Sequence, residues 1–149
     1  MNPRSFLAVA AAFVAAGTLA VRAADAAWLT DATLAQTKAR TEGRMVMLEF
    51  TGSDWCPPCK KMAAEVFPSA EFKAFAGKNL VPVKLDFPQR TKLPAAQQQA
   101  NDALAKKYGV NAFPTLIFLR PDGSKAGELV GYTDTKSLIK AAEKFQAKK

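Results

Sequence analysis

The sequence of 149 residues contains no histidine and only two cysteines. Because the chain has no imidazole, it cannot form a Ser-His-Asp triad, a Cys-His protease site or a histidine-ligated metal site. Basic residues outnumber acidic ones, 21 to 13, yet no basic segment is interleaved with stacking aromatic residues, so nucleic acid is a poor candidate partner. With 49% hydrophobic and 23% charged residues, the composition predicts one globular domain.

The N-terminal segment has the pattern of an export signal. Arg4 is followed by an alanine-rich apolar run over residues 5–21, and small residues near the end of the segment suit cleavage. We therefore expect a signal peptide over residues 1–23, with cleavage as late as residue 26, and a periplasmic mature domain over residues 24–149. An uncleaved membrane anchor is the second interpretation, although 17 weakly apolar residues are few for a span of about 20.

The mature chain alternates helix and strand patterns. Helices are expected over 32–41, 56–66, 69–77, 95–108 and 136–148, and strands over 45–51, 80–87, 115–119 and 126–131. A break is expected at Pro68, because proline lacks a backbone N–H and clashes with the preceding helical turn. Pro82, inside a strand pattern, predicts that its strand lies at an edge of the sheet.

The order of these elements predicts a mixed α/β sheet. A right-handed crossover makes the first two strands parallel neighbours, and the turn over residues 120–124 joins the last two strands in an antiparallel hairpin. The helices cover the sheet with apolar faces. The expected members are Leu34, Ala35 and Ala39 over 32–41, Cys59, Met62, Ala63 and Val66 over 56–66, and Ala100, Ala103, Leu104 and Lys107 or Tyr108 over 95–108.

The strongest motif is Trp55-Cys56-Pro57-Pro58-Cys59-Lys60, which lies where a predicted strand runs into a predicted helix. One helical turn brings the two sulfurs together into a Cys56–Cys59 pair. The unpaired N–H groups and the positive dipole end of the helix stabilise a thiolate at Cys56. Cys56 is therefore the predicted nucleophile, and Cys59 is the thiol that resolves a mixed disulfide.

Two other interpretations of the cysteine pair have less support. A purely structural disulfide suits an exported protein, but a bridge across two residues constrains the unfolded chain little. A zinc site requires four ligands, and with two cysteines and no histidine the others would come from carboxylates or a second chain. We therefore favour redox chemistry.

Several separate motifs occur in the order typical of one family. They are Glu49-Phe50 in the central strand, the Cys-Pro-Pro-Cys motif, Phe113-Pro114-Thr115 before the hairpin, and Gly131 before the last helix. Together they resemble exported thioredoxin-like thiol-disulfide oxidoreductases. The layout is similar to the periplasmic thioredoxin-like domain of DsbD-type membrane reductant transporters and to TlpA-like proteins. The resemblance implies a thioredoxin fold, with a mixed sheet of four or five strands and helices on both faces.

The resemblance also implies a client-binding surface beside the two sulfurs. Pro114 is expected to follow a cis peptide bond and to face the sulfurs. Phe113 and Thr115 are expected to offer backbone groups to an extended client segment, and Trp55 to pack as a lid beside the thiols.

Four further residues are candidates for tuning the reaction. Glu49 approximately matches a buried carboxylate of the family, usually an aspartate, and is either a proton relay for the second cysteine or an ordinary strand-end acid. Lys60 lies on the helical face of the first cysteine, where it either favours the thiolate or is simply solvated. Pro57 and Pro58 stiffen the turn between the cysteines and are expected to tune the reduction potential.

These features predict a periplasmic monomer that reduces disulfides of exported proteins, with electrons from a DsbD-like membrane donor and no bound cofactor. Three alternatives stay open, which are an oxidant, an isomerase, and a binding module that grips clients at Phe113-Pro114 without turnover. Arg90 and Lys92, in the loop over residues 88–94, either bias the choice of partner or are simply solvated.

Overall fold

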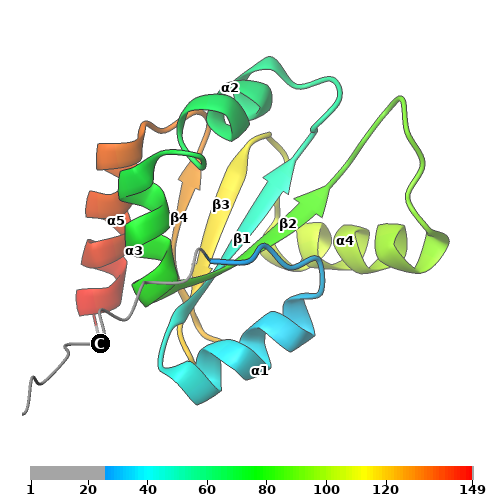
Figure 1. Ribbon diagram of the computed structural model, residues 1–149. Helices are drawn as coiled ribbons and strands as arrows, with labels where there is room; N and C mark the ends of the chain where they lie inside the picture. The colour runs from blue at the N-terminus through cyan, green and yellow to red at the C-terminus, as the bar shows by residue number, and fades with distance from the viewer. Residues whose placement is uncertain (1–25, 149) are drawn as a thin grey trace, which may run out of the picture.

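The computed structural model describes residues 26–148, so the predicted signal peptide over residues 1–23 lies outside the described residues. The elements are α1 (Ala32–Glu42), β1 (Met45–Thr51), α2 (Pro57–Glu65), α3 (Ala70–Asn79), β2 (Leu80–Asp86), α4 (Ala95–Tyr108), β3 (Thr115–Leu119), β4 (Lys125–Val130) and α5 (Thr135–Ala147), as Figure 1 shows. None of the helices between residues 26 and 148 has the length and apolar character that crossing a membrane requires.

The four strands form one mixed sheet in the order β2-β1-β3-β4 (Figure 1). Strands β1 and β2 are parallel, whereas β3 is antiparallel to both β1 and β4. The predicted mixed sheet and its C-terminal hairpin are therefore confirmed. At the outer edge of β2, Leu29 adds a single parallel bridge to Val83, so the fifth strand is reduced to one residue.

The proline in β2 lies at the edge of the sheet, as predicted. The carbonyl of Pro82 accepts a hydrogen bond of 2.9 Å from the N–H of Leu29, on the side away from β1. Because the backbone N and O of one strand residue point to the same side, the missing N–H of Pro82 also faces outward. The presence of proline at position 82 therefore removes no hydrogen bond between β2 and β1.

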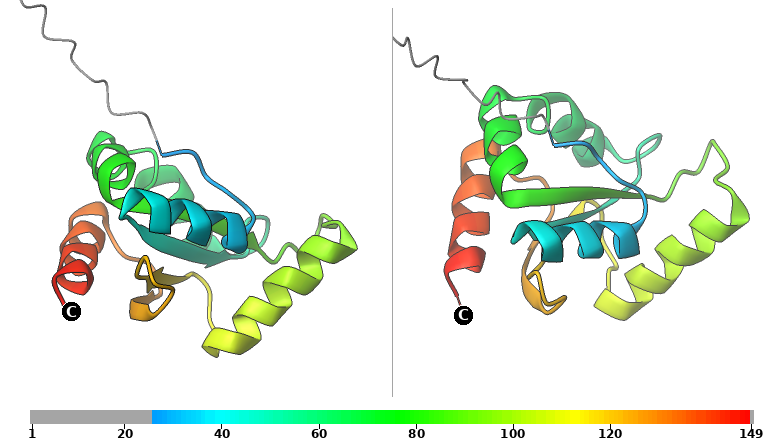
Figure 2. Two further views of the ribbon diagram at one scale, coloured as in Figure 1. Left: turned by 90° about the horizontal axis from the view of Figure 1, so that it is seen from below. Right: turned by 60° about the horizontal axis from the view of Figure 1, so that its bottom comes forward.

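Helices cover both faces of the sheet (Figure 2). Apolar residues of α2, α3 and α5 pack on one face, among them Met62, Phe72 and Leu138. Residues of α1 and α4 pack on the other face, among them Ala39 and Leu104. Every residue of β1 is buried, as its apolar run predicts, and Glu49 is thereby carried into the core.

Two of the predicted apolar helix faces are wrong in part. Leu34 of α1 is 56% exposed, because the helix reaches the sheet through the small residues Ala35 and Ala39. In α2, Ala63 is exposed, whereas Met62 on the same helix is buried. The predicted burial of Ala35 and Ala39 in α1, of Met62 in α2 and of Val66 directly after it is confirmed, so each pattern is wrong at one residue.

The predicted apolar face of α4 is wrong in part, because Ala100 and Ala103 are exposed while Asn101 is buried. Leu104 and Tyr108 pack against the core as predicted. The Asn101 amide donates a hydrogen bond of 2.9 Å to the Asp86 carbonyl and accepts one of 2.8 Å from Gln97. With both groups satisfied, the polar side chain can be buried at little cost. Asn101 thus fixes α4 to the end of β2.

The helix predicted to end at Gly77 continues to Asn79. Arg44 donates a hydrogen bond of 3.2 Å to the Gly77 carbonyl, and the Asn79 side chain donates one of 2.9 Å to the Phe75 carbonyl. These bonds supply donors to carbonyls at the end of the helix, so the glycine does not terminate it. The predicted break at Pro68 is confirmed, since α2 ends at Glu65 and α3 begins at Ala70.

Candidate active site

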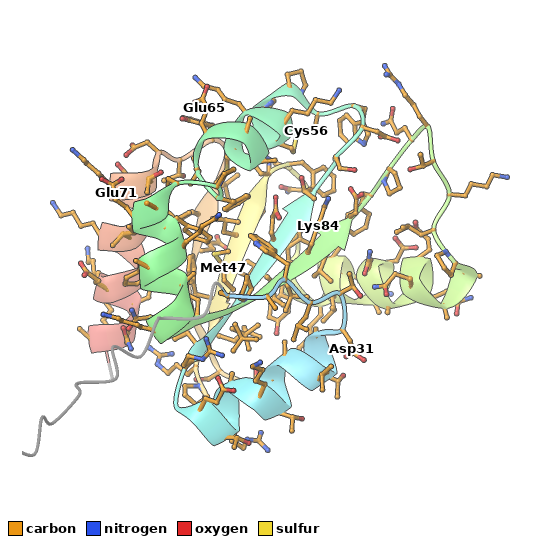
Figure 3. All side chains as sticks on the ribbon, in the orientation of Figure 1. Asp31, Met47, Cys56, Glu65, Glu71 and Lys84 are labelled. Atoms are coloured by element: carbon orange, nitrogen blue, oxygen red, sulfur yellow. A yellow bond between two sulfur atoms is a disulfide. The ribbon has the colours of Figure 1, made fainter. Side chains whose placement is uncertain are left out.

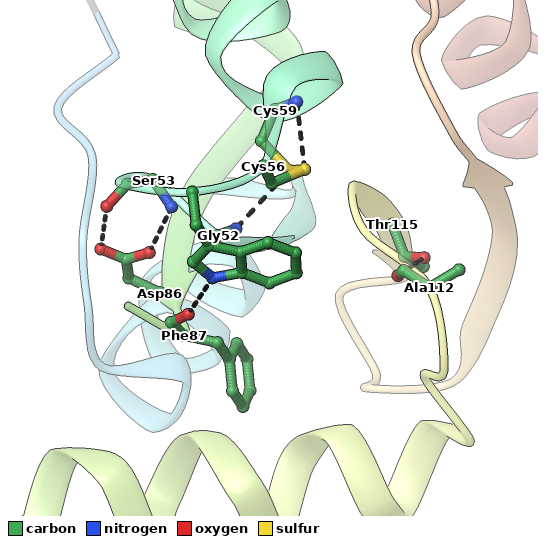
Figure 4. Close-up of a disulfide and its surroundings, with 9 residues drawn as sticks. Gly52, Ser53, Cys56, Cys59, Asp86, Phe87, Ala112 and Thr115 are labelled. Carbon is green, nitrogen blue, oxygen red and sulfur yellow. Dashed lines mark hydrogen bonds between the residues drawn. A yellow bond between two sulfur atoms is a disulfide. The ribbon is translucent and has the colours of Figure 1, made fainter. Parts of the chain in front are cut away.

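The two cysteines are joined by a disulfide at the start of α2 (Figure 4). Cys56 is the N-cap of the helix, and its sulfur accepts a hydrogen bond of 3.4 Å from the N–H of Cys59. The N–H of Gly52 lies 3.5 Å from the Cys59 sulfur and donates to it. Only 3% of Cys56 and 1% of Cys59 are exposed. Each sulfur therefore accepts a backbone N–H, and the N–H at the start of the helix points at the Cys56 sulfur, where a thiolate would form on reduction.

The two prolines between the cysteines explain why the Cys59 N–H is directed at sulfur. Pro57 and Pro58 occupy the first two positions of α2. These positions would otherwise present N–H groups that no helical carbonyl can accept, and proline has none to present. The first N–H of the helix is therefore that of Cys59, and it bonds to the Cys56 sulfur.

The turn before the first cysteine is hydrogen-bonded to the end of β2. Ser53 donates its N–H to the Asp86 carboxylate at 2.9 Å, and its hydroxyl donates to the other oxygen (Figure 4). The Trp55 indole N–H donates to the Phe87 carbonyl at 2.8 Å. A methyl group on Gly52 would lie 2.5 Å from the Trp55 ring, so only glycine fits beneath the indole. The turn is therefore held in one conformation beside the disulfide.

The peptide bond between Phe113 and Pro114 is cis. The Pro114 carbonyl accepts a hydrogen bond of 2.8 Å from the N–H of Gly131, and the Thr115 hydroxyl donates one of 2.8 Å to Ala112. In Figure 4, Thr115 and Ala112 lie on the side of the disulfide away from Ser53 and Asp86. Hydrogen bonds thus hold the cis-proline loop on both sides of its cis peptide bond.

Aromatic ring contacts connect the cis-proline loop with the turn that carries Trp55 and with β1. The ring of Phe113 meets the Trp55 indole edge-on, with the centroids 5.8 Å apart. The same ring lies 5.2 Å from Phe87, which in turn stacks on Phe50 of β1. Aromatic contacts of this kind contribute about 1 kcal/mol each beyond the area they bury. Trp55, the residue before Cys56, is thus held by its ring contact with Phe113 and its hydrogen bond to Phe87.

Glu49 lies in the middle of β1 and is only 3% exposed. Burial raises the pKa of its carboxyl to about 7, while the charge of Lys84 and a hydrogen bond from Thr51 oppose that rise. Lys84 is the residue opposite Glu49 on β2, below the end of α2 that carries Cys56 in the view of Figure 3. The carboxyl is therefore able to gain or lose a proton near neutral pH.

A cavity of about 620 Å³ lies on the inner side of the disulfide and reaches both Glu49 and Cys59. Its walls include the apolar residues Trp28 and Phe67, and Lys60 lies at its lining as well. Because the cavity is open to solvent, it connects the buried carboxyl and the second sulfur to water.

The structure thus brings most of the predicted site residues together. Cys56, Cys59 and Trp55 share the start of α2, and Phe113 contacts Trp55 directly. Lys60 is exposed on α2 and lines the same cavity as Cys59. Between residues 26 and 148, no three cysteine, aspartate or glutamate side chains cluster as a metal site would require.

Sequence reasoning missed the residues that hold the turn in place, namely Gly52, Ser53, Asp54, Asp86 and Phe87. Each of them is an ordinary turn or strand-end residue in the sequence. The hydrogen bonds of Ser53, Asp54 and Trp55 join residues more than 30 positions apart along the chain, so no local pattern reveals the pairing.

The family profile described as a thioredoxin-like domain matches residues 32–146, which cover the four strands and the five helices except for the last residue of α5. The disulfide at the start of a helix and the four-stranded mixed sheet are features of thioredoxin-like thiol-disulfide oxidoreductases. The chain belongs to the thioredoxin-like family.

Curated relatives support the same class of enzyme. The chain is 38% identical over 112 residues to the disulfide bond reductase DsbH of Chlamydia pneumoniae, covering 75% of this chain and 67% of that protein. It is 36% identical over 96 residues to an H-type thioredoxin of Oryza sativa subsp. indica, covering 64% of each chain. The matches thus span about two thirds of these relatives' own length.

Solved structures agree with these relatives. The structure of a DsbH oxidoreductase is 35% identical with a TM-score of 0.68, covering 79% of this chain and 86% of that one. The reduced C-terminal domain of Neisseria meningitidis DsbD is 26% identical with a TM-score of 0.57, covering 78% of this chain and 97% of that domain. The chain is therefore a thioredoxin-like protein-disulfide oxidoreductase.

Proposed function

We propose that this protein reduces disulfides of exported proteins in the periplasm. The observation that carries the proposal is the Cys56–Cys59 disulfide at the start of α2, with a carboxyl of raised pKa on its inner side. The direction is supported by the likeness to a protein named a disulfide bond reductase. The compartment is supported by the export pattern of residues 1–23.

The first step is attack by the Cys56 thiolate on one sulfur of the client disulfide. A bond forms between the Cys56 sulfur and that client sulfur, and the client S–S bond breaks. The second client sulfur leaves as a thiolate and takes a proton from water. Cys56 is suited to this role because the N–H of Cys59 already points at its sulfur.

The second step is resolution by Cys59. The ionised Glu49 carboxyl accepts the thiol proton of Cys59, directly or through water in the cavity that both residues line. The Cys59 thiolate then attacks the Cys56 sulfur, which forms the internal disulfide and breaks the bond to the client. The first client sulfur leaves as a thiolate and takes a proton from water. The client has gained two electrons and the protein has lost two, which is the oxidised state in the structure.

The outer surface beside the disulfide is proposed to bind the client. Pro114, Phe113 and Thr115 form one wall and Trp55 the other, and an extended client segment between them would pair with backbone groups of the cis-proline loop. Renewed reduction of the disulfide requires an electron donor, for which a DsbD-like membrane protein is the proposed candidate. Likeness to a DsbD domain supports that candidate.

The reduction potential tests the direction of electron flow. A value near about −270 mV in glutathione or dithiothreitol buffers supports a reductant, and one near about −120 mV supports an oxidant. The Cys56→Ser variant is the control, because it cannot form the internal disulfide. If no reversible two-electron transition is found, the proposal fails and a binding module without turnover takes its place.

The compartment is tested separately. Mass spectrometry of the protein from a periplasmic extract is expected to find a new N-terminus between residues 24 and 27. Recovery only in the cytoplasmic fraction, with residues 1–23 intact, contradicts the proposed location.

A further inference from the structure

The turn before Cys56 is hydrogen-bonded through three successive residues, Ser53, Asp54 and Trp55, to the end of β2 and the segment that follows it. The exchange reaction requires none of these bonds, because it takes place between sulfur atoms and a proton acceptor. Their physical effect is to fix the segment over residues 86–91 beside the disulfide.

Asp54 makes the least expected of these contacts. Its carboxylate accepts hydrogen bonds from three consecutive backbone N–H groups, those of Gln89 at 2.9 Å, Arg90 at 2.8 Å and Thr91 at 3.1 Å. Consecutive N–H groups that converge on an anion hold a loop in one conformation. Since Asp54 lies two residues before Cys56, the loop between β2 and α4 is held next to the active site (Figure 1).

This loop carries positive charge on its exposed side. Arg90 and Lys92 are both exposed, as is Lys60 one helical turn after the first cysteine. The rest of the loop, residues 87–94, contains no acidic residue. A client that approaches this side of the site from solvent therefore meets the two exposed cations of the loop.

The carboxylates of the region are oriented toward the protein. The oxygens of Asp54 accept the backbone N–H groups of the loop, and those of Asp86 accept the N–H and hydroxyl of Ser53. Both carboxylates are therefore engaged by donors of the protein itself. Arg90 and Lys92 are left exposed to solvent beside them.

We propose that the loop over residues 87–94 selects clients, and that it favours disulfides flanked by acidic residues. This inference rests on the proposed reductase function and adds the chemical class of its protein partners. Asp54 is a positioning residue in this account, because it acts on the client through the loop that it holds.

The effect belongs to the encounter between protein and client. Exposed cations raise the association rate of an acidic partner and lower that of a basic one, and salt screens both effects. The Debye length falls from about 10 Å at 0.1 M salt to about 3 Å at 1 M, so the preference should fade over that range.

The test uses three synthetic peptides, each with one internal disulfide, that differ only in their flanking residues, which are Glu, Gln or Lys. The second-order rate constant for reduction of each peptide by the reduced protein is measured at low and high salt. We expect the acidic peptide to react about tenfold faster than the basic one at low salt, and less than about twofold faster at 1 M.

Charge reversal on the loop is the decisive variant. Arg90→Glu combined with Lys92→Glu is expected to invert the ratio of acidic to basic peptide rates. The matched control is Lys140→Glu combined with Lys144→Glu on α5, which changes the net charge equally at exposed positions of another element. That control should keep the preference for acidic peptides.

Asp54→Asn tests the positioning role, since it removes the charge that gathers the three N–H groups. The ratio of acidic to basic rates should fall, while the reduction potential stays that of the natural protein. A changed potential would assign Asp54 to the disulfide itself and overturn its role in selection.

Three results overturn the inference as a whole. They are equal rates for the acidic and basic peptides at low salt, a preference for the basic peptide, or an equal effect of the α5 control. If the protein reduces the neutral peptide but shows no preference, the reductase function stands and only this inference fails. If none of the three peptides is reduced, both fail.

Discussion

The two sides of the disulfide differ in how they are built. The inner side, which consists of Glu49, Cys59 and the cavity, lies against β1 and is shaped by burial. The outer side, which consists of Trp55 and the loop with Phe113, is shaped by hydrogen bonds and ring contacts between turns. The inner side contains one titratable group of raised pKa, whereas the outer side presents aromatic and backbone groups.

This difference separates two tasks of a dithiol exchanger. Proton transfer requires a carboxyl whose pKa lies near neutral pH, and burial in the sheet supplies that. Recognition of varied clients requires a firm surface with exposed backbone groups, and turns fixed by hydrogen bonds supply that. Substitutions confined to one side of the disulfide can therefore separate the two tasks.

The largest effect is expected from the two sulfurs themselves. Cys56→Ser and Cys59→Ser should each abolish multiple turnover of a disulfide client. Only Cys59→Ser should accumulate a covalent mixed disulfide, because the nucleophile remains while the resolving thiol is lost. Non-reducing gel electrophoresis with mass spectrometry measures the adduct. An equal amount of adduct on Cys56→Ser would contradict the assignment of roles.

Glu49→Gln should slow resolution by a factor on the order of 100, because the amide cannot accept the Cys59 proton. In the natural protein the resolution rate should rise with pH through about 7, as the Glu49 carboxyl ionises. In the variant the rise should follow only the thiol, whose ordinary pKa is about 8.5. Stopped-flow measurement of mixed-disulfide decay distinguishes the two. Identical profiles would make Glu49 an ordinary strand-end acid.

The same carboxyl should make stability depend on pH. The pKa of Glu49 is about 7 in the folded protein and about 4.5 when unfolded, so the folded state binds the extra proton between these values. Stability is therefore highest below pH 4.5 for this group, and roughly 3 kcal/mol is lost by the time the pH exceeds 7.

Urea unfolding of the oxidised protein and of Glu49→Gln measures this loss. The difference in unfolding free energy between the two proteins should change by roughly 3 kcal/mol from pH 4.5 to pH 8, in favour of the variant at high pH. Taking the difference cancels the other carboxyls. A difference that does not vary with pH would show that Glu49 titrates normally.

The sheet, the order of the elements and the cysteine motif could be predicted because each follows from a local pattern. Runs such as residues 45–51 specify strands by hydrophobicity, and Pro68 and Pro82 act through the backbone of their own segments. The face of α4 could be predicted only in part, because burial of Asn101 depends on a carbonyl at the end of β2.

The residues of the site likewise fall into those that the sequence predicts and those that it does not. The cysteine pair and Glu49 are visible as a motif and as an acid in an apolar strand. The contacts of Asp54 and Asp86 are not, because they join turns that come together only after the sheet has formed. The sequence thus indicates the reacting groups better than the surface that presents them.

Gly52→Ala tests that presenting surface. The added methyl group would lie 2.5 Å from the Trp55 indole, so the ring must move and its bond to Phe87 is disturbed. We expect a loss of about 2 kcal/mol in stability, in the range of overpacking substitutions. Urea unfolding measures it. Gly43→Ala is an instructive companion, since its methyl group meets no atom within 4 Å and only its left-handed backbone, with φ of 65°, is unfavourable.

The smallest effect is expected from the two tryptophans, one on each side of the disulfide. Trp55→Phe removes an indole N–H that bonds to the Phe87 carbonyl at 2.8 Å, which should lower stability by about 1 kcal/mol. Trp28→Phe changes the wall of the inner cavity, where the centroid of the indole lies 4.9 Å from that of the Phe67 ring.

Since a client is proposed to bind at the outer side, only Trp55→Phe should raise the KM for a protein disulfide. Steady-state reduction of insulin by both variants measures this, and an equal rise in KM for Trp28→Phe would place client contacts on the inner side as well.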